Sequence, residues 1–246
     1  MRDRIMRAAG AVFCATVAFM PVSALAFDVN KASSNFDFVS LDDAELSARH
    51  IKTVDMGNVE LTSGRIVAAD PLAQPDRPAL AKTVPVGEYP VRLYEAFGRV
   101  AASSMRIAEG KPDHWELATI PGQDVATLKD DEIFGYPVDA GLGSYMDADT
   151  LDLIEEREQQ VQAAKPDSDV NYYDVVASEL DANKGVYDLH RPIAGKKGNV
   201  AIFWSGWGDG FYPVFWGLDK DGRPLVLLTD FQVTENADGR REPNHK

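Results

Sequence analysis

Residues 199–231 read Asn199-Val-Ala-Ile-Phe-Trp-Ser-Gly-Trp-Gly-Asp-Gly-Phe-Tyr-Pro-Val-Phe-Trp-Gly-Leu-Asp-Lys-Asp-Gly-Arg-Pro-Leu-Val-Leu-Leu-Thr-Asp-Phe231, and they hold three of the four tryptophans of the chain. The apolar runs at 200–204, 212–216 and 225–228 are short, rich in aromatic and β-branched residues, and bounded by Gly and Asp. This pattern is typical of strands. The stretch therefore predicts three adjoining antiparallel strands at the centre of the fold.

Two turns separate these strands. Ser205-Gly-Trp-Gly-Asp-Gly210 contains three glycines, which adopt positive φ without a Cβ clash, and Asp219-Lys-Asp-Gly222 ends in an Asp-Gly pair typical of hairpins. The middle strand carries apolar side chains on both faces, so we expect it to be covered on both sides. Pro213 opposes this placement, because a residue without an N–H favours a sheet edge or a bulge.

The first 26 residues have the composition of a signal peptide. Three arginines lie within the first seven residues, an apolar run of 13 residues follows at 8–20, and Ala24-Leu-Ala26 is a small-x-small cleavage site. The apolar run is too short to span a bilayer. We expect cleavage between Ala26 and Phe27 and an exported chain, periplasmic or secreted, without membrane insertion after cleavage.

The charge and cysteine content restrict the partners of the expected mature chain. The net charge of −14 becomes −16 once the leader, with its three Arg and one Asp, is removed. Such an excess argues against binding to nucleic acid or anionic membranes, and it permits a basic protein partner. The alternative is that the acidic surface serves only solubility. Cys14 is the one cysteine, so the mature chain has no disulfide, thiol nucleophile or cysteine-based metal site.

The rest of the chain predicts an α+β fold, a mainly antiparallel β-sheet meander with two helices inserted around residues 150–181. We expect a short helix capped by Ser40, two strands within 51–67, three consecutive strands that form the meander, and two helices. These elements are expected at 41–50 for the short helix, at 87–95, 98–107 and 114–120 for the strands, and at 151–164 and 172–180 for the helices.

This organisation divides the chain into four parts. They are a signal peptide at 1–26, an N-terminal strand and loop extension at 27–83, a main domain at 84–234, and a frayed tail at 235–246.

Catalytic motifs are missing from the sequence. Phe203 precedes Ser205, so the Gly-x-Ser-x-Gly nucleophile pattern fails. The chain has no Gly-x-x-x-x-Gly-Lys-Ser/Thr loop and no His-Glu-x-x-His pair. We therefore predict no cofactor and no metal, and the sequence assigns no catalytic residue.

Five aspartates and one tryptophan are the candidate binding residues. Asp139 and Asp209 lie beside glycines, and such carboxylates can bind calcium or act as acid and base. The alternative, which we favour, is that each aspartate closes its own turn by accepting backbone N–H bonds. The full set of candidates is Asp139, Asp147, Trp207, Asp209, Asp219 and Asp230.

The three tryptophans of the opening stretch divide into two groups. Trp204 and Trp216 lie inside predicted strands, so we expect both in the core. Trp207 lies between two glycines in a turn. We favour a ring folded back over the sheet edge, and the alternative is an exposed ring that anchors a partner.

Several ordered blocks of sequence resemble the bacterial DUF4241 family over residues 84–233. Ser205-Gly-Trp-Gly-Asp-Gly210 is the most distinctive, and the others are Gly87-Glu-Tyr-Pro-Val91, Gly98-Arg-Val-Ala101, Trp115-Glu-Leu-Ala118, Phe134-Gly-Tyr-Pro-Val-Asp-Ala-Gly141 with Asp147, and Trp216-Gly-Leu-Asp219 through Asp230-Phe231. The resemblance implies a domain and, because the family has no assigned reaction, no activity.

Two hypotheses on function follow. The first is a non-catalytic binding protein of the cell envelope, which rests on the predicted export, the acidic composition and the missing catalytic motifs. The second is an exported hydrolase or carbohydrate-active enzyme that uses Asp139 and Asp209, provided that their loops meet in space.

Overall fold

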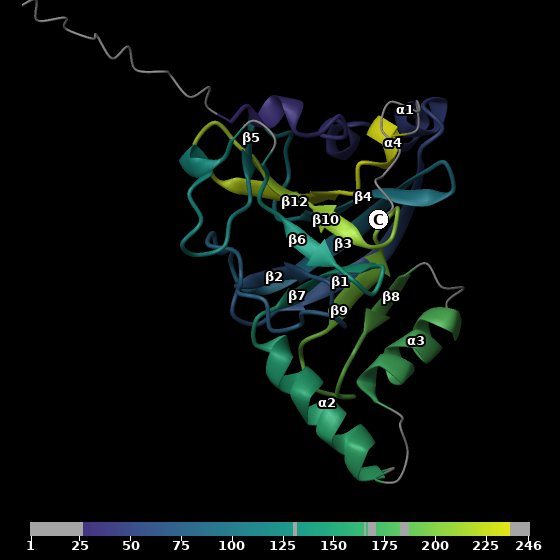
Figure 1. Ribbon diagram of the computed structural model, residues 1–246. Helices are drawn as coiled ribbons and strands as arrows, with labels where there is room; N and C mark the ends of the chain where they lie inside the picture. Colours follow the sequence, from purple (N-terminus) through teal and green to yellow (C-terminus); the bar gives the residue numbers. More distant parts are fainter. Residues whose placement is uncertain (1–26, 130–131, 165, 167–170, 183–186, 237–246) are drawn as a thin grey trace, which may run out of the picture.

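A computed structural model shows that two antiparallel sheets, packed face to face, form the body of the protein (Figure 1). The structure describes residues 27–129, 132–164, 166, 171–182 and 187–236. The predicted signal peptide and most of the predicted tail lie outside these residues.

The larger sheet has six strands in the order β1-β3-β4-β12-β11-β5. They are β1 (Lys52–Leu61), β3 (Gly87–Ala96), β4 (Arg99–Arg106), β12 (Pro224–Asp230), β11 (Val214–Leu218) and β5 (His114–Leu117). The smaller sheet has four strands in the order β2-β7-β9-β8, namely β2 (Ile66–Ala69), β7 (Leu142–Asp147), β9 (Val200–Trp204) and β8 (Tyr187–His190). A third, two-stranded ribbon pairs β6 (Tyr136–Val138) with β10 (Gly210–Tyr212).

The main core lies between the two sheets. Alternate side chains of the four-stranded sheet, including Tyr145 and Phe203, meet side chains of the six-stranded sheet, including Leu93 and Trp216, in one apolar cluster. Tyr145 and Phe203 pack edge to face, with ring centroids 5.3 Å apart. Because successive residues of a strand face opposite sides, the neighbours of these residues face away from this core.

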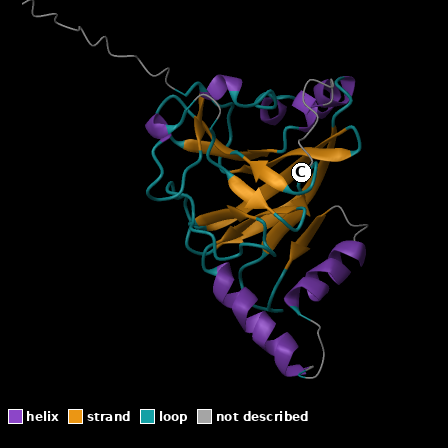
Figure 2. Cartoon of the chain, viewed as in Figure 1, coloured by secondary structure: helices purple, strands orange, loops and turns teal. Residues whose placement is uncertain are grey.

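Two helices, α2 (Thr150–Ala164) and α3 (Tyr172–Ala182), cover the outer face of the four-stranded sheet (Figure 2). Ile154 and Val176 from the helices form a second apolar cluster with Val200 and Ile202 of β9. The two helices predicted near residues 150–181 are therefore confirmed. Within the described part of the chain, no helix has both the length and the apolar character that a membrane span requires.

The N-terminal segment covers the outer face of the six-stranded sheet. It contains the 3₁₀ turns Val29–Lys31 and Phe38–Ser40 and helix α1 (Asp43–Ala48); a further 3₁₀ turn (Val125–Thr127) and helix α4 (Val233–Asn236) complete the set. Phe36 stacks on Trp115 at 4.4 Å and meets Phe215 edge-on at 4.9 Å. Both faces of β11 are therefore covered, as its sequence predicts.

Helix α1 begins later than predicted. Its N-cap is Asp42, not Ser40, because Asp42 and Glu45 form a reciprocal capping box in which each side chain accepts the other residue's backbone N–H. The predicted extension at 27–83 also contributes β1 to one sheet and β2 to the other.

The α+β class and the antiparallel pairing are confirmed, and the strand order differs from the expected one in two places. The opening stretch divides between the two sheets, because β9 pairs with β7 and β8 while β11 and β12 pair with each other. Pro213 separates β10 from β11 and so interrupts the strand predicted at 212–216. The expected meander of three consecutive strands is reduced to the β3–β4 pair, because β5 pairs with β11 and not with β4.

Candidate functional site

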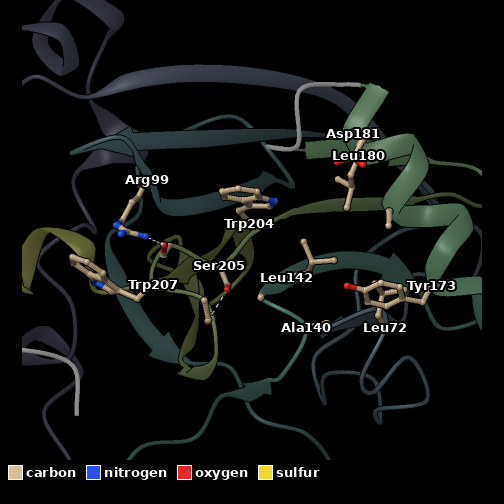
Figure 3. A pocket seen from close by; sticks show the side chains of 14 residues that line it. Leu72, Arg99, Ala140, Leu142, Tyr173, Leu180, Asp181, Trp204, Ser205 and Trp207 are labelled. Atoms are coloured by element: carbon tan, nitrogen blue, oxygen red, sulfur yellow. Dashed lines mark hydrogen bonds between the residues drawn. The ribbon is translucent and has the colours of Figure 1, made fainter. Parts of the chain in front are cut away.

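An open cleft of about 390 Å³ lies beside the end of β9, between α3 and the glycine-rich turn at 205–210 (Figure 3). This volume is within the range of roughly 300–1,000 Å³ that small-ligand sites occupy. Its lining combines aromatic and aliphatic side chains with one cation, one carboxylate and exposed backbone. The lining residues are Leu72, Arg99, Ala140, Gly141, Leu142, Tyr173, Ala177, Leu180, Asp181, Trp204, Ser205, Gly206, Trp207 and Gly208.

Trp204 is the central side chain of the cleft. It is the last residue of β9 and shares a face with Val200 and Ile202, which α2 and α3 cover. At Trp204 the helical cover ends, so 53% of the residue is exposed. The prediction that Trp204 is a core residue is therefore wrong, while Trp216, 1% exposed, confirms its own prediction. Tyr173 of α3, also 53% exposed, is a second aromatic residue of the lining.

The turn after Trp204 is held by short-range hydrogen bonds. The Ser205 hydroxyl donates to the Gly208 carbonyl at 2.8 Å, and the Ser205 amide donates to the Gly141 carbonyl at 3.1 Å. Gly206 has a φ of +68°, and a Cβ there would lie 2.8 Å from the Val100 carbonyl oxygen. Only glycine fits this close approach to β4. The motif Ser205–Gly210 therefore builds one wall of the cleft.

Trp207 and Arg99 close one end of the cleft. The guanidinium of Arg99 lies over the Trp207 ring, 4.4 Å from the ring centroid, and it donates to the Gly206 carbonyl at 3.0 Å. Trp207 is half-buried and packs against the main core, which confirms the ring folded back over the sheet edge. Within the described residues its indole Nε1–H is buried and has no hydrogen-bond acceptor.

The tight β3–β4 hairpin positions Arg99. Ala96 pairs with Arg99, and the two residues between them, Phe97 and Gly98, have φ values of +53° and +73°. Positive φ at both positions is the geometry of a type I′ turn, which matches the twist of the flanking strands. Arg99 is thus the first residue of β4, directly after this hairpin turn.

Asp70 holds the opposite wall of the cleft. Its side chain is fully buried, and one carboxylate oxygen accepts the backbone N–H groups of Asp139 at 3.0 Å and Ala140 at 2.6 Å. The other oxygen accepts the N–H groups of Leu72 and Ala73. Asp70 therefore joins the loop after β2 to the loop after β6. It was not among the residues predicted for the site.

The structure brings the loops of Asp139 and Asp209 together. Val138 pairs with Gly210 in the β6–β10 ribbon, so the two aspartates follow and precede paired residues at the same end of it. A Cβ added to Gly141 would lie 4.0 Å from the Gly208 Cα. Both aspartates are exposed and border the cleft without lining it. Burial, together with the nearby charge of Asp209, raises the pKa of Tyr212 to about 12.

The remaining candidate aspartates lie away from the cleft lining. Asp147 is fully buried and accepts the N–H groups of Ser63 and Gly64 at 2.9 and 3.0 Å. Asp219 closes the β11–β12 turn by accepting the N–H groups of Asp221 and Arg223, both at 2.9 Å.

Asp230 is also fully buried. It accepts the Asn35 side-chain amide at 2.9 Å and the Gln232 N–H at 2.7 Å, and so joins the N-terminal segment to the end of β12. Turn closure and segment pairing account for the geometry of Asp147, Asp219 and Asp230.

Several cleft residues were missed at the level of sequence. Arg99 belongs to β4, and Tyr173 and Asp181 both belong to α3, so only the tertiary packing of these two elements beside β9 brings the three residues to Trp204. Asp70 was the one missed residue with a signal in the sequence, because it is a carboxylate that directly follows the apolar run Ile66–Ala69 and precedes a proline.

The charged side chains of the cleft lining are Arg99 and Asp181. The described lining contains no histidine and no cysteine, and its one serine hydroxyl donates to a backbone carbonyl instead of to a base. The fold and site thus define an α+β protein with an open aromatic cleft.

Comparison with known proteins identifies the family of the chain. A family model described as "Protein of unknown function (DUF4241)" matches residues 59–229, so the chain belongs to the DUF4241 family. The match begins at β1, ahead of the block at 84–233 that carries the resemblance. No curated protein and no solved structure matches the chain.

Proposed function

We propose that the chain is an exported, non-catalytic binding protein of the cell envelope, and that its cleft holds a basic side chain of a protein partner. The observation that carries the proposal is the exposure of Trp204 in a cleft that also contains Tyr173 and the carboxylate of Asp181. Exposed aromatic rings that line a cleft offer a partner a large contact area, and such residues are common anchors of binding sites.

The chemistry of the lining favours a cation. Trp and Tyr rings attract ammonium and guanidinium groups through the negative face of the ring, an effect worth about 0.5–2 kcal/mol. Asp181 supplies a negative charge on the Tyr173 side of Trp204 (Figure 3). Asp139 and Asp209, which are exposed and adjoin the lining residues Ala140 and Gly208 in sequence, add two more charges at the border. The net charge of −14 attracts a basic partner at long range.

Arg99 does not oppose this arrangement. Its guanidinium lies at the other side of Trp204, stacked on Trp207 and bonded to the Gly206 carbonyl (Figure 3). Its positive charge is therefore held at the Trp207 end of the cleft. The half of the cleft between Trp204 and Asp181 is the part suited to a cation.

The test is titration with a lysine-rich peptide, followed by tryptophan fluorescence and calorimetry, against a glutamate-rich peptide of equal length. We expect binding of the basic peptide alone, weaker at high salt because screening shortens the reach of the charges. Trp204→Ala should weaken it roughly two- to thirtyfold, as loss of a cation–π contact requires.

Matched controls separate the cleft from the rest of the acidic surface. Asp181→Asn should weaken binding, while Asp152→Asn, an exposed carboxylate on α2, should not. Val86→Ala serves as the exposed apolar control. Equal binding of both peptides, or full affinity in Trp204→Ala and Asp181→Asn, would refute the proposal. The same variants then serve in pull-downs from envelope extract at low and high salt.

A second candidate function is hydrolysis, favoured by the meeting of the Asp139 and Asp209 loops. Two carboxylates about 5–10 Å apart suit glycoside hydrolysis. A panel of chromogenic glycosides tests it, with Asp139→Asn and Asp209→Asn expected to abolish turnover. An inactive wild-type chain, or turnover that survives both substitutions, would reject this function.

A further inference from the structure

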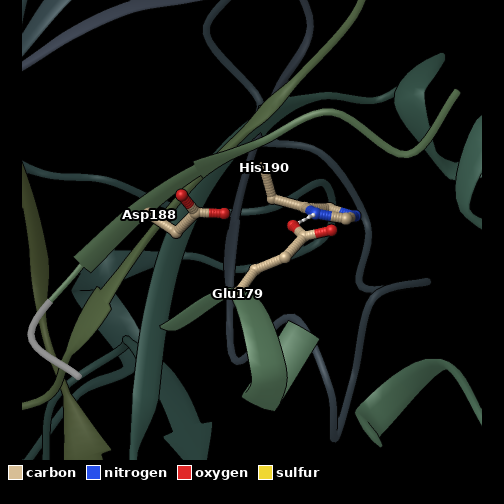
Figure 4. A group of neighbouring side chains, drawn as sticks. All are labelled: Glu179, Asp188 and His190. Carbon is tan, nitrogen blue, oxygen red and sulfur yellow. Dashed lines mark hydrogen bonds and ion pairs between the residues drawn. The ribbon is translucent and has the colours of Figure 1, made fainter. Parts of the chain in front are cut away.

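Glu179, Asp188 and His190 form a cluster on the side of α3 that faces β8 (Figure 4). One ligand atom from each residue can be chosen so that all three lie within 4.8 Å of one another. The cluster lies outside the lining of the cleft.

The local structure explains why these side chains meet. Asp188 and His190 are two residues apart on β8, so both project from the same face of the strand. Glu179 precedes Leu180 and follows Val176 on α3, and both of these pack into the apolar cluster under the helix. A carboxylate is thereby carried to the half-buried border between helix and strand.

The imidazole of His190 has unused bonding capacity. Its side chain is 1% exposed, and Nδ1 lies 2.5 Å from a Glu179 carboxylate oxygen. Within the described part of the chain, Nε2 is buried and has no hydrogen-bond partner. Of the two ring nitrogens, Nδ1 is therefore the one that faces the carboxylates, and Nε2, which has no partner among the described residues, lies on the far side of the ring.

We propose that Glu179, Asp188 and His190 bind a divalent transition-metal cation, with Zn²⁺ as the best match. One imidazole nitrogen and two carboxylate oxygens leave one position of a tetrahedral ion open to water, as in zinc sites with three protein ligands. Imidazole disfavours Mg²⁺ and Ca²⁺, which take oxygen ligands.

Metal binding requires only small movements. Zinc–ligand bonds of about 2.0–2.1 Å at a tetrahedral angle place ligand atoms roughly 3.3 Å apart. The Glu179–His190 contact, now 2.5 Å, would lengthen, and Asp188 would approach within a group already confined to 4.8 Å. Because β8 is the edge strand of its sheet and both carboxylates are half-buried, the cation has a route from solvent.

The experiment is calorimetric titration of the untagged full chain with Zn²⁺, in parallel with thermal unfolding. We expect one ion per chain and a rise in Tm, because a ligand that binds only the folded state stabilises it. Excess Mg²⁺ should not compete. His190→Gln should abolish binding, and Glu179→Gln and Asp188→Asn should each weaken it roughly tenfold or more.

The controls address folding and surface binding. His114→Gln removes an exposed histidine beside Asp113 and should leave Zn²⁺ affinity unchanged. Unfolding without metal reports whether each variant is folded; if His190→Gln is not, the half-buried Asp188→Asn decides. Absence of one-to-one binding, or wild-type affinity in the folded ligand variants, would overturn the proposal.

Discussion

The two ends of the stretch at 199–231 are both aromatic-rich strands, but the tryptophan of one strand is buried and that of the other is exposed. β11 and β12 lie inside the six-stranded sheet, and Trp216 is 1% exposed between the two sheets. β9 lies inside the four-stranded sheet, yet its last residue, Trp204, is 53% exposed at the cleft. Strand membership alone therefore does not bury a tryptophan; the cover above that position on the sheet does.

The comparison separates stability from recognition. Trp216 packs in the main core between the two sheets. Its neighbour Phe215, on the opposite face of β11, packs against Phe36 of the N-terminal segment. Trp204 faces a surface that α3 leaves open. The first residue is expected to matter for folding and the second for binding, and replacement of each by alanine tests this division.

Replacement of Trp216 has the largest expected effect. Trp216→Ala leaves a cavity in the main core and should lower the free energy of unfolding by about 3–5 kcal/mol. Trp204→Ala, the matched change at the other end, should lower it by about 0.5 kcal/mol or less. Urea unfolding followed by circular dichroism measures both. Similar losses in the two variants would contradict the division.

Replacement of Asp147 comes second. Its buried carboxylate accepts the N–H groups of Ser63 and Gly64 and the Ser63 hydroxyl at 2.8 Å. Asp147→Asn keeps the shape but places a donor against donors, so we expect a loss of about 2–4 kcal/mol in unfolding free energy. Asp139→Asn, an exposed aspartate beside the cleft, is the control and should change stability little. A tolerated Asp147→Asn would mean that the turn is held by other contacts.

Local patterns in the sequence predicted the strands well and the sheet assignment less well. The apolar runs and the Asp219-Lys-Asp-Gly222 turn correctly predicted β9 and the β11–β12 hairpin, because such signals act within a few residues. That β9 pairs with β7 depends on residues about 60 positions away, from Leu142 to Trp204. No short-range pattern carries that information.

The cleft was predictable only in part, for the same reason. The glycine-rich turn and Trp207 were found because glycine marks its own backbone geometry. Asp70 was missed because the N–H groups it accepts, on Asp139 and Ala140, lie 69 and 70 residues further along the chain. Trp204 was wrongly placed in the core because a strand pattern does not reveal where the helical cover ends.

The third prediction concerns the ion pair that joins the two sheets. Glu60 of β1 accepts two hydrogen bonds from the Arg191 guanidinium, at 2.7 and 3.0 Å, and one from the Gly198 N–H at 2.8 Å. The Arg191 bonds, followed by the Gly198 bond, lower the pKa of Glu60 from 4.5 to about 2. The ionised form is therefore favoured in the folded state.

Glu60→Gln should lower the free energy of unfolding by about 1.5–3 kcal/mol at pH 7, the range for hydrogen bonds to a charged group. Since the folded pKa is depressed, this contribution is present above the ordinary pKa of 4.5 and is lost as the pH falls towards 2. The difference between wild type and variant should shrink over that interval. Asp152→Asn, an exposed carboxylate on α2, is the control. A difference that stays constant with pH would exclude this ionisation as the cause.

The smallest expected effect concerns Arg99 and Trp207, where the cleft and the core meet. Arg99→Gln removes the cation from the Trp207 ring, 4.4 Å from its centroid, and should lower the unfolding free energy by about 0.5–1 kcal/mol. Because the same guanidinium also donates to the Gly206 carbonyl, the single variant does not isolate the ring contact. A double-mutant cycle with Trp207→Leu isolates the ring contact, because Arg99→Gln removes the Gly206 bond equally in the wild-type and the Trp207→Leu backgrounds. A coupling energy near zero would assign the effect of Arg99 to the turn carbonyl, and Trp207 would then be held by apolar packing alone.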